Sequence, residues 1–370
     1  MRVLFLTNVP VPYRVDFFNE LGKYCELEVL FEQSAEEQTH RSSNWFDKTF
    51  ENFKASYLID KNGKKRLDTV IPYLQDYRKD IIVVMGYSLP IEMFAISWLR
   101  FHRVPFFLSC DGGFIKYRHD PKRILKRFLV SSADGYLSTG NATDAFLTFY
   151  GAKPDRLFRI PLTTLYEKDI LQRPVSFSEK ASIRRELGIE EERVLLSVGQ
   201  FIYRKGYDIL LRAAEGLDDD IGIYIIGSEA TAEYIQMKRE LDLEHVHFVG
   251  FRKKDELSKY YKAADAFVLP TREDIWGLVI NEALAYGLPV VTTDRCVAGL
   301  ELVNDRNGRI VPADDAQALR NAIMSVINDR DLEHMGQESL KAIQNHTIEN
   351  MAKTHFQVFF GQAESQRAAL

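Results

Sequence analysis

The sequence predicts an α/β protein made of two Rossmann-like parallel-sheet domains in tandem. The chain has 370 residues, and at about 100–200 residues per domain this length suits two domains. Short apolar, β-rich runs alternate with amphipathic helical segments, which is the pattern of β-α-β units. This alternation stops at a polar stretch near the middle of the chain and then starts again, as expected for a second domain of the same kind.

The first half contains apolar runs of about five residues, which suit strands buried on both faces of a parallel sheet. We expect strands at Val3–Thr7, Leu27–Phe31, Ile81–Met85, Pro105–Ser109, Gly135–Ser138 and Leu157–Ile160. The amphipathic segments Arg14–Tyr24 and Ile91–Phe101 lie between them. They predict the crossover helices that parallel strands require.

The second half repeats this pattern after the polar segment Tyr166–Glu179, which contains Pro174 and few apolar residues. The expected strands are Val194–Val198, Ile221–Ile226, His247–Val249, Ala266–Leu269 and Pro289–Thr292. Helical patterns at Tyr207–Glu215 and Ala232–Leu241 lie between them, and two further helices are expected after about Asp331.

These patterns divide the chain into four parts. We expect an N-terminal domain over residues 1–165, a linker over 166–180, a C-terminal domain over 181–350 and a C-terminal helix over 351–370 that could pack back on the N-terminal domain. Two such domains would turn the carboxyl ends of two sets of strands toward a central cleft. Ligands of these folds bind outside those strand ends.

Composition and termini limit the class of protein. The net charge of −5 argues against a dedicated nucleic-acid binder, which usually carries a basic footprint. The three cysteines lie far apart and form no C-x-x-C pair, as in a reducing compartment. The N-terminal apolar run is too short for a signal peptide, and no apolar run reaches the ~18 residues that span a bilayer. We therefore expect a cytoplasmic protein, free or attached to a membrane surface.

Several familiar catalytic motifs are absent from the sequence. There is no Gly-x4-Gly-Lys-Ser/Thr phosphate loop, no Gly-x-Gly-x-x-Gly fingerprint, no His-Glu-x-x-His and no Gly-x-Ser-x-Gly. His245 and His247 alternate on an expected strand, but no further Cys or His stands near them in sequence. We therefore expect no metal site.

The stretch from Pro270 to Val291 predicts an anion-binding helix terminus. An acidic loop follows a strand, and Gly277 then opens a helix. The free N–H groups and the dipole at such a helix N-terminus favour a phosphate. Glu282 lies one turn after Leu278 on the same helix face, where its carboxylate could accept hydrogen bonds from a ribose. The alternative is that Glu282 is a solvated helix residue and Asp274 a helix cap.

A second strand-loop-helix unit begins at Val198. Gly199 ends the strand, Gly206 opens the helix, and Arg204 and Lys205 bring two cations to the loop. Fixed cations are a direct means of stabilising the negative charge that grows on a diphosphate leaving group, and Arg can clamp a phosphate with two hydrogen bonds. The alternative is an ordinary pair of surface charges.

The two units contain motifs of a known family. Asp274-Ile-Trp-Gly is followed by Glu282-Ala-Leu-Ala-Tyr-Gly-Leu-Pro-Val. The accompanying motifs are the Gly199…Lys205-Gly206 loop, His247-Phe-Val-Gly-Phe, Ala263-Ala-Asp-Ala-Phe-Val-Leu-Pro, Gly299-Leu-Glu-Leu-Val and Asn307-Gly-Arg-Ile-Val-Pro. Through them, residues 194–311 resemble the donor-binding half of retaining glycosyltransferases of family 4, which have the GT-B fold. The signature of that family is Glu-x7-Glu, and the N-terminal half is similar mainly in architecture.

The resemblance implies a nucleotide-diphosphate sugar, UDP- or GDP-linked, as the donor, with no cofactor and no metal. It implies that Arg204 and Lys205 contact the diphosphate and that Glu282 holds the ribose hydroxyls. Asp274 would face the transferred sugar. The other implied donor-binding residues are Gly199, Gln200, Phe251 and Arg252 beside the base, Glu273, Trp276, and Gly277, Leu278 and Val279 with their backbone N–H groups.

The chain departs from the family pattern on the donor side. Asp274 stands where the signature has its first Glu, and its side chain is one carbon shorter, which retracts the carboxylate by ~1.5 Å. Glu273 is adjacent and could substitute for it. Gln200 stands where many relatives have a phosphate-binding Arg, and Arg204 could compensate.

It also departs on the acceptor side. The segment Asn8-Val-Pro-Val-Pro-Tyr-Arg replaces a Gly-Gly loop after the first strand, and Tyr13 and Arg14 could touch phosphate or acceptor. Asp111 sits at a predicted strand end, where Gly112 allows a close approach. Asp111 is our candidate for a catalytic residue on the acceptor side. The alternative is a turn-forming Asp-Gly.

Residues 116–130 are basic with apolar interleaving. Lys122 and Arg123 are repeated one turn later by Lys126 and Arg127. A basic amphipathic helix of this kind can lie on an anionic membrane surface. The alternative is an exposed helix with one face in the core.

We therefore expect a retaining glycosyltransferase with a glycan or lipid-linked acceptor, working in bacterial cell-surface polysaccharide biosynthesis. It would be cytoplasmic, at the cytoplasmic face of the inner membrane if residues 116–130 contact it. Two alternatives stay open: a GT-B-fold sugar-nucleotide epimerase or hydrolase, and a non-catalytic protein that binds a sugar or nucleotide.

Overall fold

The protein consists of two compact α/β units. A computed structural model describes residues 1–32, 49–58, 66–115, 121–218 and 220–368. The first unit combines residues 1–163 with residues 347–370, and the second comprises residues 164–346. Residues 166–180, expected as a linker, are therefore part of the second unit.

The first unit is built on a parallel sheet with seven strands among the described residues, in the order β3-β2-β1-β4-β5-β6-β7. The strands are β1 (Arg2–Thr7), β2 (Glu26–Phe31), β3 (Lys54–Tyr57), β4 (Ile81–Met85), β5 (Phe107–Cys110), β6 (Gly135–Ser138) and β7 (Leu157–Arg159). All neighbouring pairs run parallel. The chain thus adds strands outward from β1 on one side and outward from β4 on the other.

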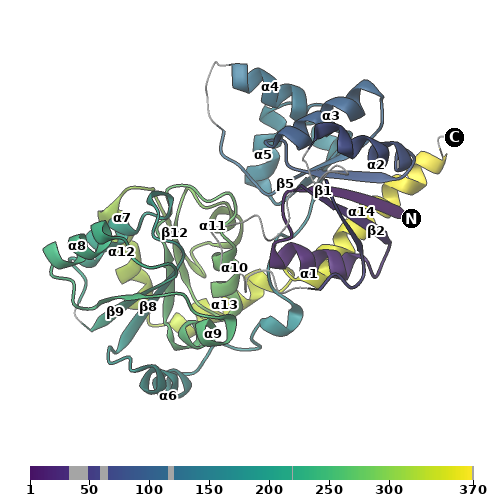
Figure 1. Ribbon diagram of the computed structural model, residues 1–370. Coiled ribbons are helices and arrows are strands. Elements are labelled where there is room, and N and C mark those ends of the chain that lie inside the picture. Colours follow the sequence, from purple (N-terminus) through teal and green to yellow (C-terminus); the bar gives the residue numbers. More distant parts are fainter. Residues whose placement is uncertain (33–48, 59–65, 116–120, 219, 369–370) are drawn as a thin grey trace. The chain divides into compact units, whose positions relative to one another are not determined.

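Helices cover both faces of this sheet (Figure 1). They are α1 (Pro12–Leu21), α2 (Ile71–Asp76), α3 (Pro90–Phe101), α4 (Pro121–Val130), α5 (Asn141–Phe149) and α14 (Ile348–Ala368), with short 3-10 turns at Leu67–Val70 and Pro154–Arg156. The alternation along β1 explains the two layers, because successive side chains of a strand point to opposite faces. Leu4 and Leu6 join the core beneath α2 to α5, whereas Phe5 points to the layer of α1 and α14.

The C-terminal helix α14 packs against α1 in the first unit. His355 of α14 contacts the rings of Phe5 and Phe17, with ring centroids 4.6 Å apart for the pair Phe17–His355, and Phe359 contacts the ring of Phe5. The last helix of the chain therefore completes a core that the first strand and the first helix begin.

The second unit has a parallel sheet with six strands among the described residues, in the order β10-β9-β8-β11-β12-β13. The strands are β8 (Arg193–Val198), β9 (Ile221–Ile226), β10 (Val246–Val249), β11 (Ala266–Leu269), β12 (Val290–Thr293) and β13 (Gly308–Val311). The helices are α6 (Phe177–Leu187), α7 (Tyr207–Ala214), α8 (Ala232–Glu240), α9 (Lys254–Ala263), α10 (Leu278–Ala285), α11 (Val297–Leu302), α12 (Ala316–Ile327) and α13 (Leu332–Ile343), with 3-10 turns at Glu167–Asp169 and Tyr203–Lys205.

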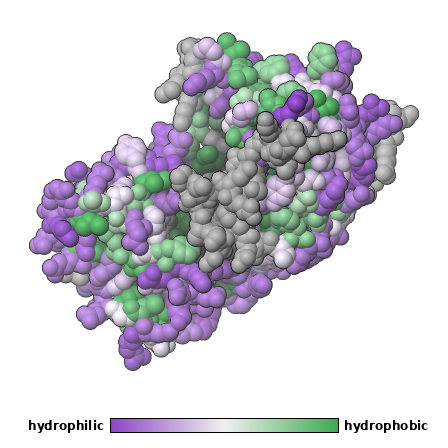
Figure 2. Space-filling view, in the orientation of Figure 1, coloured by the Kyte–Doolittle hydropathy of each residue, from purple (hydrophilic) through white to green (hydrophobic). Residues whose placement is uncertain are grey.

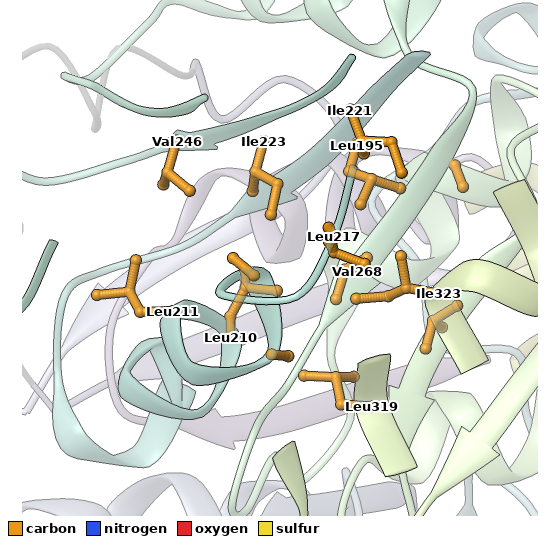
Figure 3. Close-up of a cluster of buried hydrophobic side chains, with 14 of the residues drawn as sticks. Leu195, Leu210, Leu211, Leu217, Ile221, Ile223, Val246, Val268, Leu319 and Ile323 are labelled. Atoms are coloured by element: carbon orange, nitrogen blue, oxygen red, sulfur yellow. The ribbon is translucent and has the colours of Figure 1, made fainter. Parts of the chain in front are cut away.

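The core of the second unit forms where α7 and α12 pack on one face of the sheet (Figure 3). Leu195, Ile223 and Val268 extend from three neighbouring strands, and Leu210 and Ile323 meet them from the helices. All five side chains are fully buried, at 0% exposure. This packing fixes β8 and β11 side by side, and the loops that follow these two strands carry most of the predicted site.

The predicted fold class, α/β with two Rossmann-like parallel-sheet domains, is confirmed. Each predicted strand lies within two residues of an observed one, but the edge strands β3 and β13 were not expected. In the part of the chain that the structure describes, no helix is both long and apolar enough to cross a membrane.

Candidate functional site

The second unit has its topological switch point between β8 and β11, which are neighbours in the sheet while the chain leaves them in opposite directions. Loops after such strands diverge and leave a crevice at the carboxyl edge of the sheet, where ligands of these folds bind. The loop after β8 carries Arg204 and Lys205, and the loop after β11 carries Glu273 and Asp274. The predicted donor residues thus come from two adjacent strand ends.

Gly206 lets the two loops approach each other. It has a φ of +69°, and a Cβ at this position would lie 2.1 Å from the backbone oxygen of Pro270. Only glycine avoids both the left-handed strain and this clash. The 3-10 turn Tyr203–Lys205 is therefore pressed against the end of β11, and α7 begins directly after it.

Arg204 and Lys205 both bind the carboxylate of Asp274. Lys205 Nζ lies 2.5 Å from Asp274 Oδ2, and Arg204 Nη1 lies 3.1 Å from Oδ1. Arg204 Nη1 also donates to the backbone oxygen of Glu273 at 2.7 Å. Asp274 is 9% exposed, so this carboxylate is largely withdrawn from water and shared by two cations. The three groups carry a net charge of +1, which leaves the cluster able to attract an anion.

Arg272, which no sequence motif indicates, connects the same two loops. Its guanidinium donates to both carboxylate oxygens of Asp208, at 2.8 and 2.6 Å, and to the backbone oxygen of Tyr203 at 2.8 Å. It also lies 4.0 Å from the centroid of the Tyr203 ring and pairs with Asp314 at 2.5 Å. Burial would raise the pKa of Asp208, but the hydrogen bonds from Arg272 outweigh it and lower this pKa.

Gly277 directly precedes α10, so the N–H groups of the first turn of this helix lie at the carboxyl edge of the sheet. The φ of Gly277 is +100°, and a Cβ there would lie 2.6 Å from Cys296 Sγ. Trp276 is 3% exposed and donates from Nε1 to Asn281 Oδ1 at 2.9 Å. This hydrogen bond holds the loop before α10 against the helix. The first N–H groups of an α-helix, here those of Leu278 and Val279, have no partner within the helix.

Glu282 lies one turn into α10 and is held from behind by Tyr261 of α9. The Tyr261 hydroxyl donates to Glu282 Oε2 at 2.9 Å, and the Thr164 hydroxyl lies 3.5 Å from Oε1. The Tyr286 ring stacks on Tyr261 at 5.0 Å with an interplanar angle of 2°. Burial raises the pKa of Glu282, although the Tyr261 hydrogen bond opposes the shift. Sequence gave no signal for Tyr261, because only the packing of α9 on α10 brings it there.

The remaining donor-side predictions lie around these loops. Gly199 ends β8, and a Cβ there would lie 2.8 Å from the buried hydroxyl of Tyr207. Gln200 is exposed beside it. Phe251, 62% exposed, and Arg252 follow β10, which is the edge strand two positions from β8. They therefore stand at the same edge of the sheet as the cations, but farther along it.

The acceptor-side predictions meet in the first unit. Arg14 donates from Nη1 to Thr7 Oγ1 at 2.6 Å and to Asn8 Oδ1 at 2.8 Å, and its Nη2 lies 3.1 Å from Asp111 Oδ2. The structure thus joins Arg14 and Asp111, which are 97 positions apart in sequence. The Arg14 guanidinium lies over the Tyr13 ring, with its central carbon 5.8 Å from the ring centroid. Gly112 has a φ of +143°, which favours glycine after Asp111.

Metal ligation has no counterpart at these positions. Within the described ranges, no group of three or more His, Cys, Asp and Glu side chains lies close enough together to hold a metal ion.

Most of the second unit is similar in sequence to a known protein family. Residues 179–342 match the family model for glycosyl transferases group 1. This match to group 1 glycosyltransferases contains the loops after β8 and β11 and the whole of α10. A curated relative, D-inositol 3-phosphate glycosyltransferase of Corynebacterium diphtheriae, is 32% identical over 223 residues, which are 57% of this chain and 52% of the relative. The chain thus spans about half the length of the curated relatives it matches.

Solved structures resemble the chain over its full length. Sucrose-phosphate synthase from Thermosynechococcus elongatus has a TM-score of 0.76 at 18% identity and covers 99% of this chain and 100% of its own. Anabaena HepE in complex with UDP and glucose has a TM-score of 0.70 at 18% identity and covers 100% of both chains. At this identity the likeness shows the fold, and these neighbours share the two-domain GT-B fold with this chain.

Proposed function

We propose that the protein is a glycosyltransferase that moves a sugar from a nucleotide-diphosphate sugar to an acceptor. The observation that carries this proposal is the switch point of the second unit, where Arg204 and Lys205 face the strand end that leads into α10. Two cations and a helix N-terminus are suited to hold a diphosphate and to stabilise the charge that develops when it leaves. The match to group 1 glycosyltransferases and the UDP bound to a structural neighbour support the same assignment.

In this proposal the donor binds along the carboxyl edge of the second sheet. Arg204, Lys205 and the N–H groups of Gly277, Leu278 and Val279 would bind the diphosphate. The carboxylate of Glu282 would accept hydrogen bonds from the ribose. Gly199, Gln200, Glu273 and Trp276 would shape the loops, and Phe251 with Arg252 would border the base.

Asp274 lowers the net positive charge of the proposed diphosphate site. Its carboxylate neutralises part of the charge on Lys205 and Arg204 at distances of 2.5 and 3.1 Å. A diphosphate brings more negative charge than Asp274 and could bind the outer N–H groups of Arg204, whose side chain is 45% exposed. Asp274 would then be left to contact hydroxyls of the transferred sugar.

We propose that transfer proceeds with retention of the anomeric configuration and without a metal. The bond between the anomeric carbon and the phosphate oxygen breaks, a bond to the acceptor oxygen forms on the same face, and the acceptor proton goes to the leaving phosphate. Arg204, Lys205 and the α10 terminus would stabilise that phosphate. Tyr13, Arg14, Asp111 and Gly112 of the first unit would bind the acceptor.

The acceptor we propose is a glycan or a lipid-linked sugar in the synthesis of a cell-surface polysaccharide. The enzyme would then work on the cytoplasmic side of the inner membrane, with contact through residues 116–130. Residues 116–120 lie outside the described residues, and residues 121–130 form α4.

A ligand screen tests the donor assignment. Purified protein is heated with UDP, GDP, ADP or CMP and with their common sugar conjugates, in the presence of EDTA. A ligand at about 100 times its Kd stabilises the native state by about 2.7 kcal/mol and raises the melting temperature. We expect one nucleoside diphosphate to give this shift, and Lys205→Ala and Glu282→Ala to abolish it. The exposed Lys153→Ala serves as the matched control.

Product analysis tests the reaction. With the donor that the screen identifies, we expect transfer to an acceptor glycan, and the anomeric configuration of the product, read by NMR, reports retention. Rapid consumption of the donor without an acceptor would favour an epimerase or a hydrolase. Absence of a shift with every nucleotide would contradict the proposed donor site.

A further inference from the structure

Tyr207 is the first residue of α7, and its ring lies inside the second unit. The side chain is 0% exposed and belongs to the same buried cluster as Leu195 and Leu210. Its ring centroid lies 5.0 Å from that of Phe201, at an interplanar angle of 51°. These contacts hold the ring in place, so they also fix the direction in which its hydroxyl points.

The Tyr207 hydroxyl has no hydrogen-bond partner among the residues that the structure describes. Tyr136 and Tyr261 are similarly buried, but each of their hydroxyls donates a hydrogen bond of 2.9 Å. Ser197 lies near the Tyr207 hydroxyl, but it donates its own proton to the backbone oxygen of Val268 at 2.6 Å. A buried hydroxyl without a partner lowers stability, and a phenylalanine would fill the same space without this loss.

Bulk solvent does not satisfy this hydroxyl. Hydrophilic residues cover most of the visible surface around α7 and α8 (Figure 2), where water can bind their polar groups. The Tyr207 oxygen is buried instead. Burial also raises the pKa of Tyr207, so the hydroxyl stays protonated at neutral pH and can donate a hydrogen bond. It therefore suits an acceptor that arrives with a ligand.

The hydroxyl points toward Gly199, at the carboxyl end of β8. A Cβ on Gly199 would lie 2.8 Å from the Tyr207 oxygen and 3.5 Å from Lys205 Cε. The hydroxyl and the Lys205 side chain thus approach the same point above Gly199, which is itself partly exposed. Lys205 Nζ is one bond beyond Cε, so an anion that binds this ammonium group comes close to the Tyr207 hydroxyl.

We propose that the Tyr207 hydroxyl donates a hydrogen bond to the diphosphate of the sugar nucleotide, over Gly199. Lys205 Nζ would turn from Asp274 toward the diphosphate, and the hydroxyl would gain access to an oxygen of the same group. Phosphate oxygens are charged acceptors, which form the stronger hydrogen bonds. The inference rests on the proposed donor site. It adds a neutral side chain from the core to contacts that are otherwise cations and backbone N–H groups.

Tyr207→Phe tests this hydrogen bond by two measurements. Isothermal titration of the full chain with UDP, GDP and ADP should show about a tenfold loss of affinity for the diphosphate that the parent protein binds. Without nucleotide, the melting temperature should stay the same or rise by a few degrees, because the variant removes a buried hydroxyl that has no partner in the described fold.

Tyr136→Phe is the matched control, because it removes the hydroxyl of a similarly buried tyrosine in the first unit. This hydroxyl donates to the backbone oxygen of Val130 at 2.9 Å. The control should therefore lower the melting temperature and leave the nucleotide affinity unchanged. If Tyr207→Phe behaves in the same way as Tyr136→Phe, its hydroxyl is bound within the fold and the proposal is wrong.

A 2′,3′-dideoxyribonucleoside diphosphate identifies the part of the ligand that meets the hydroxyl. Tyr207→Phe should lose the same factor in affinity for this ligand as for the ribonucleotide, because both carry the diphosphate. A loss confined to the ribonucleotide would place the partner of Tyr207 on the ribose and contradict the assignment.

Gly199→Ala separates a contact with the ligand from a mere need for space. The added Cβ would meet the Tyr207 hydroxyl at 2.8 Å, so this variant should lose stability, and Tyr207→Phe should restore it in the double variant. The nucleotide affinity of the double variant should still be at least about tenfold below that of the parent. Recovery of the parent affinity together with stability would show that Gly199 only makes room for the hydroxyl.

Failure of the donor site and failure of this inference give different results. If the parent protein binds none of the three diphosphates, the proposed donor site is wrong and the role of Tyr207 falls with it. If the parent protein binds one of them and Tyr207→Phe binds it equally well, only the role of Tyr207 is overturned.

Discussion

Lys205 Nζ lies 2.5 Å from Asp274 Oδ2, although the two residues are 69 positions apart and follow different strands. Both side chains are largely buried. The pair joins the loop after β8 to the loop after β11 at the switch point of the second sheet. The pair therefore connects the two loops of the candidate donor site, and the Asp274 carboxylate competes with an anionic ligand for Lys205.

This pairing predicts opposite effects for its two members. Asp274→Asn removes the negative charge that competes for Lys205 and Arg204, so a nucleoside diphosphate should bind several-fold more tightly while sugar transfer falls. Lys205→Ala should remove measurable diphosphate binding and lower the free energy of unfolding by about 1–3 kcal/mol, because it leaves a largely buried carboxylate with a single cation. Isothermal titration and thermal unfolding measure both effects.

The exposed Asp305→Asn is the control for a general effect of charge. If Asp274→Asn binds the diphosphate more weakly than the parent protein, Asp274 does not compete for the cations.

Tyr261→Phe should weaken the binding of ribonucleotides without disturbing the fold. The hydroxyl fixes Glu282 and favours its ionised form, and its loss should cost about 1–1.5 kcal/mol, or five- to tenfold in Kd. Because burial already raises the pKa of Glu282, the variant should raise it further. Ribonucleotide affinity, which needs the carboxylate ionised, should then reach its plateau at a higher pH than in the parent protein.

Deoxyribonucleotides provide the matched test. A 2′,3′-dideoxyribonucleoside diphosphate, which lacks both ribose hydroxyls, should bind the parent protein and Tyr261→Phe with the same affinity at every pH. An equal loss for both ligands would mean that Tyr261 acts through general packing and not through Glu282.

Arg272→Lys should loosen the loop that carries the cations. Lys cannot reproduce the paired hydrogen bonds to Asp208, and we expect a loss of about 1–2 kcal/mol in the free energy of unfolding. The pKa of Asp208 is lowered in the folded protein, so its contribution is present above its unfolded pKa and is lost as pH falls through the folded value. Thermal unfolding between pH 5 and about pH 2 should therefore depend less on pH in the variant.

Arg295→Lys is the control for Arg272, because Arg295 is about half exposed and lies 3.9 Å from Asp294. A variant Arg272→Lys that unfolds and binds nucleotide like this control would show that the clamp contributes nothing.

Gly277→Ala should destabilise the protein more than Gly188→Ala. Both glycines have positive φ, at +100° and +69°, so both variants carry backbone strain of about 1 kcal/mol. At Gly188 no atom lies within 4 Å of the added Cβ, whereas at Gly277 the Cys296 sulfur lies at 2.6 Å. We expect a difference of at least about 1 kcal/mol between the two variants in chemical denaturation. Equal losses would remove the close approach of Cys296 as the reason for glycine at the start of α10.

His355 should make the first unit sensitive to moderate acid. Burial among aromatic rings lowers its pKa to about 4, and its Nδ1 is bonded to the Met351 backbone oxygen at 2.7 Å. The unfolded chain binds this proton near pH 6.5, so stability should fall as pH drops from there toward the folded pKa. His355→Phe should flatten this part of the curve of unfolding free energy against pH, and an unchanged slope would contradict the assignment.

Sequence patterns predicted those parts of the fold that repeat a simple rule. Apolar runs such as Ile81–Met85 match strands buried on both faces. The edge strand β3 escaped because its residues, Lys54-Ala-Ser-Tyr, are partly exposed and lack an apolar run. The edge strand β13 contains Gly308 and Arg309 and lacks such a run for the same reason.

The site shows the same limit. Motif spacing indicated Lys205, Asp274 and Glu282 as site residues. They lie, as expected, on the loop after β8, the loop after β11 and helix α10. Arg272 and Tyr261 support them through contacts that exist only in three dimensions. Helix α4 was expected to offer either a core-facing or a lipid-facing apolar stripe, and sequence could not decide its rotation because that depends on aromatic rings from Tyr87, Phe146 and Tyr150.

The division of the first unit between the two ends of the chain has a consequence for biosynthesis. Phe17 of α1 emerges from the ribosome early, but its partner His355 on α14 is translated only after the whole second unit. The second unit, residues 164–346, is continuous and can fold while the first still lacks its final layer. The nascent first unit therefore exposes an aromatic surface until α14 has been synthesised, and a chain that stops before His355 would leave that surface exposed permanently.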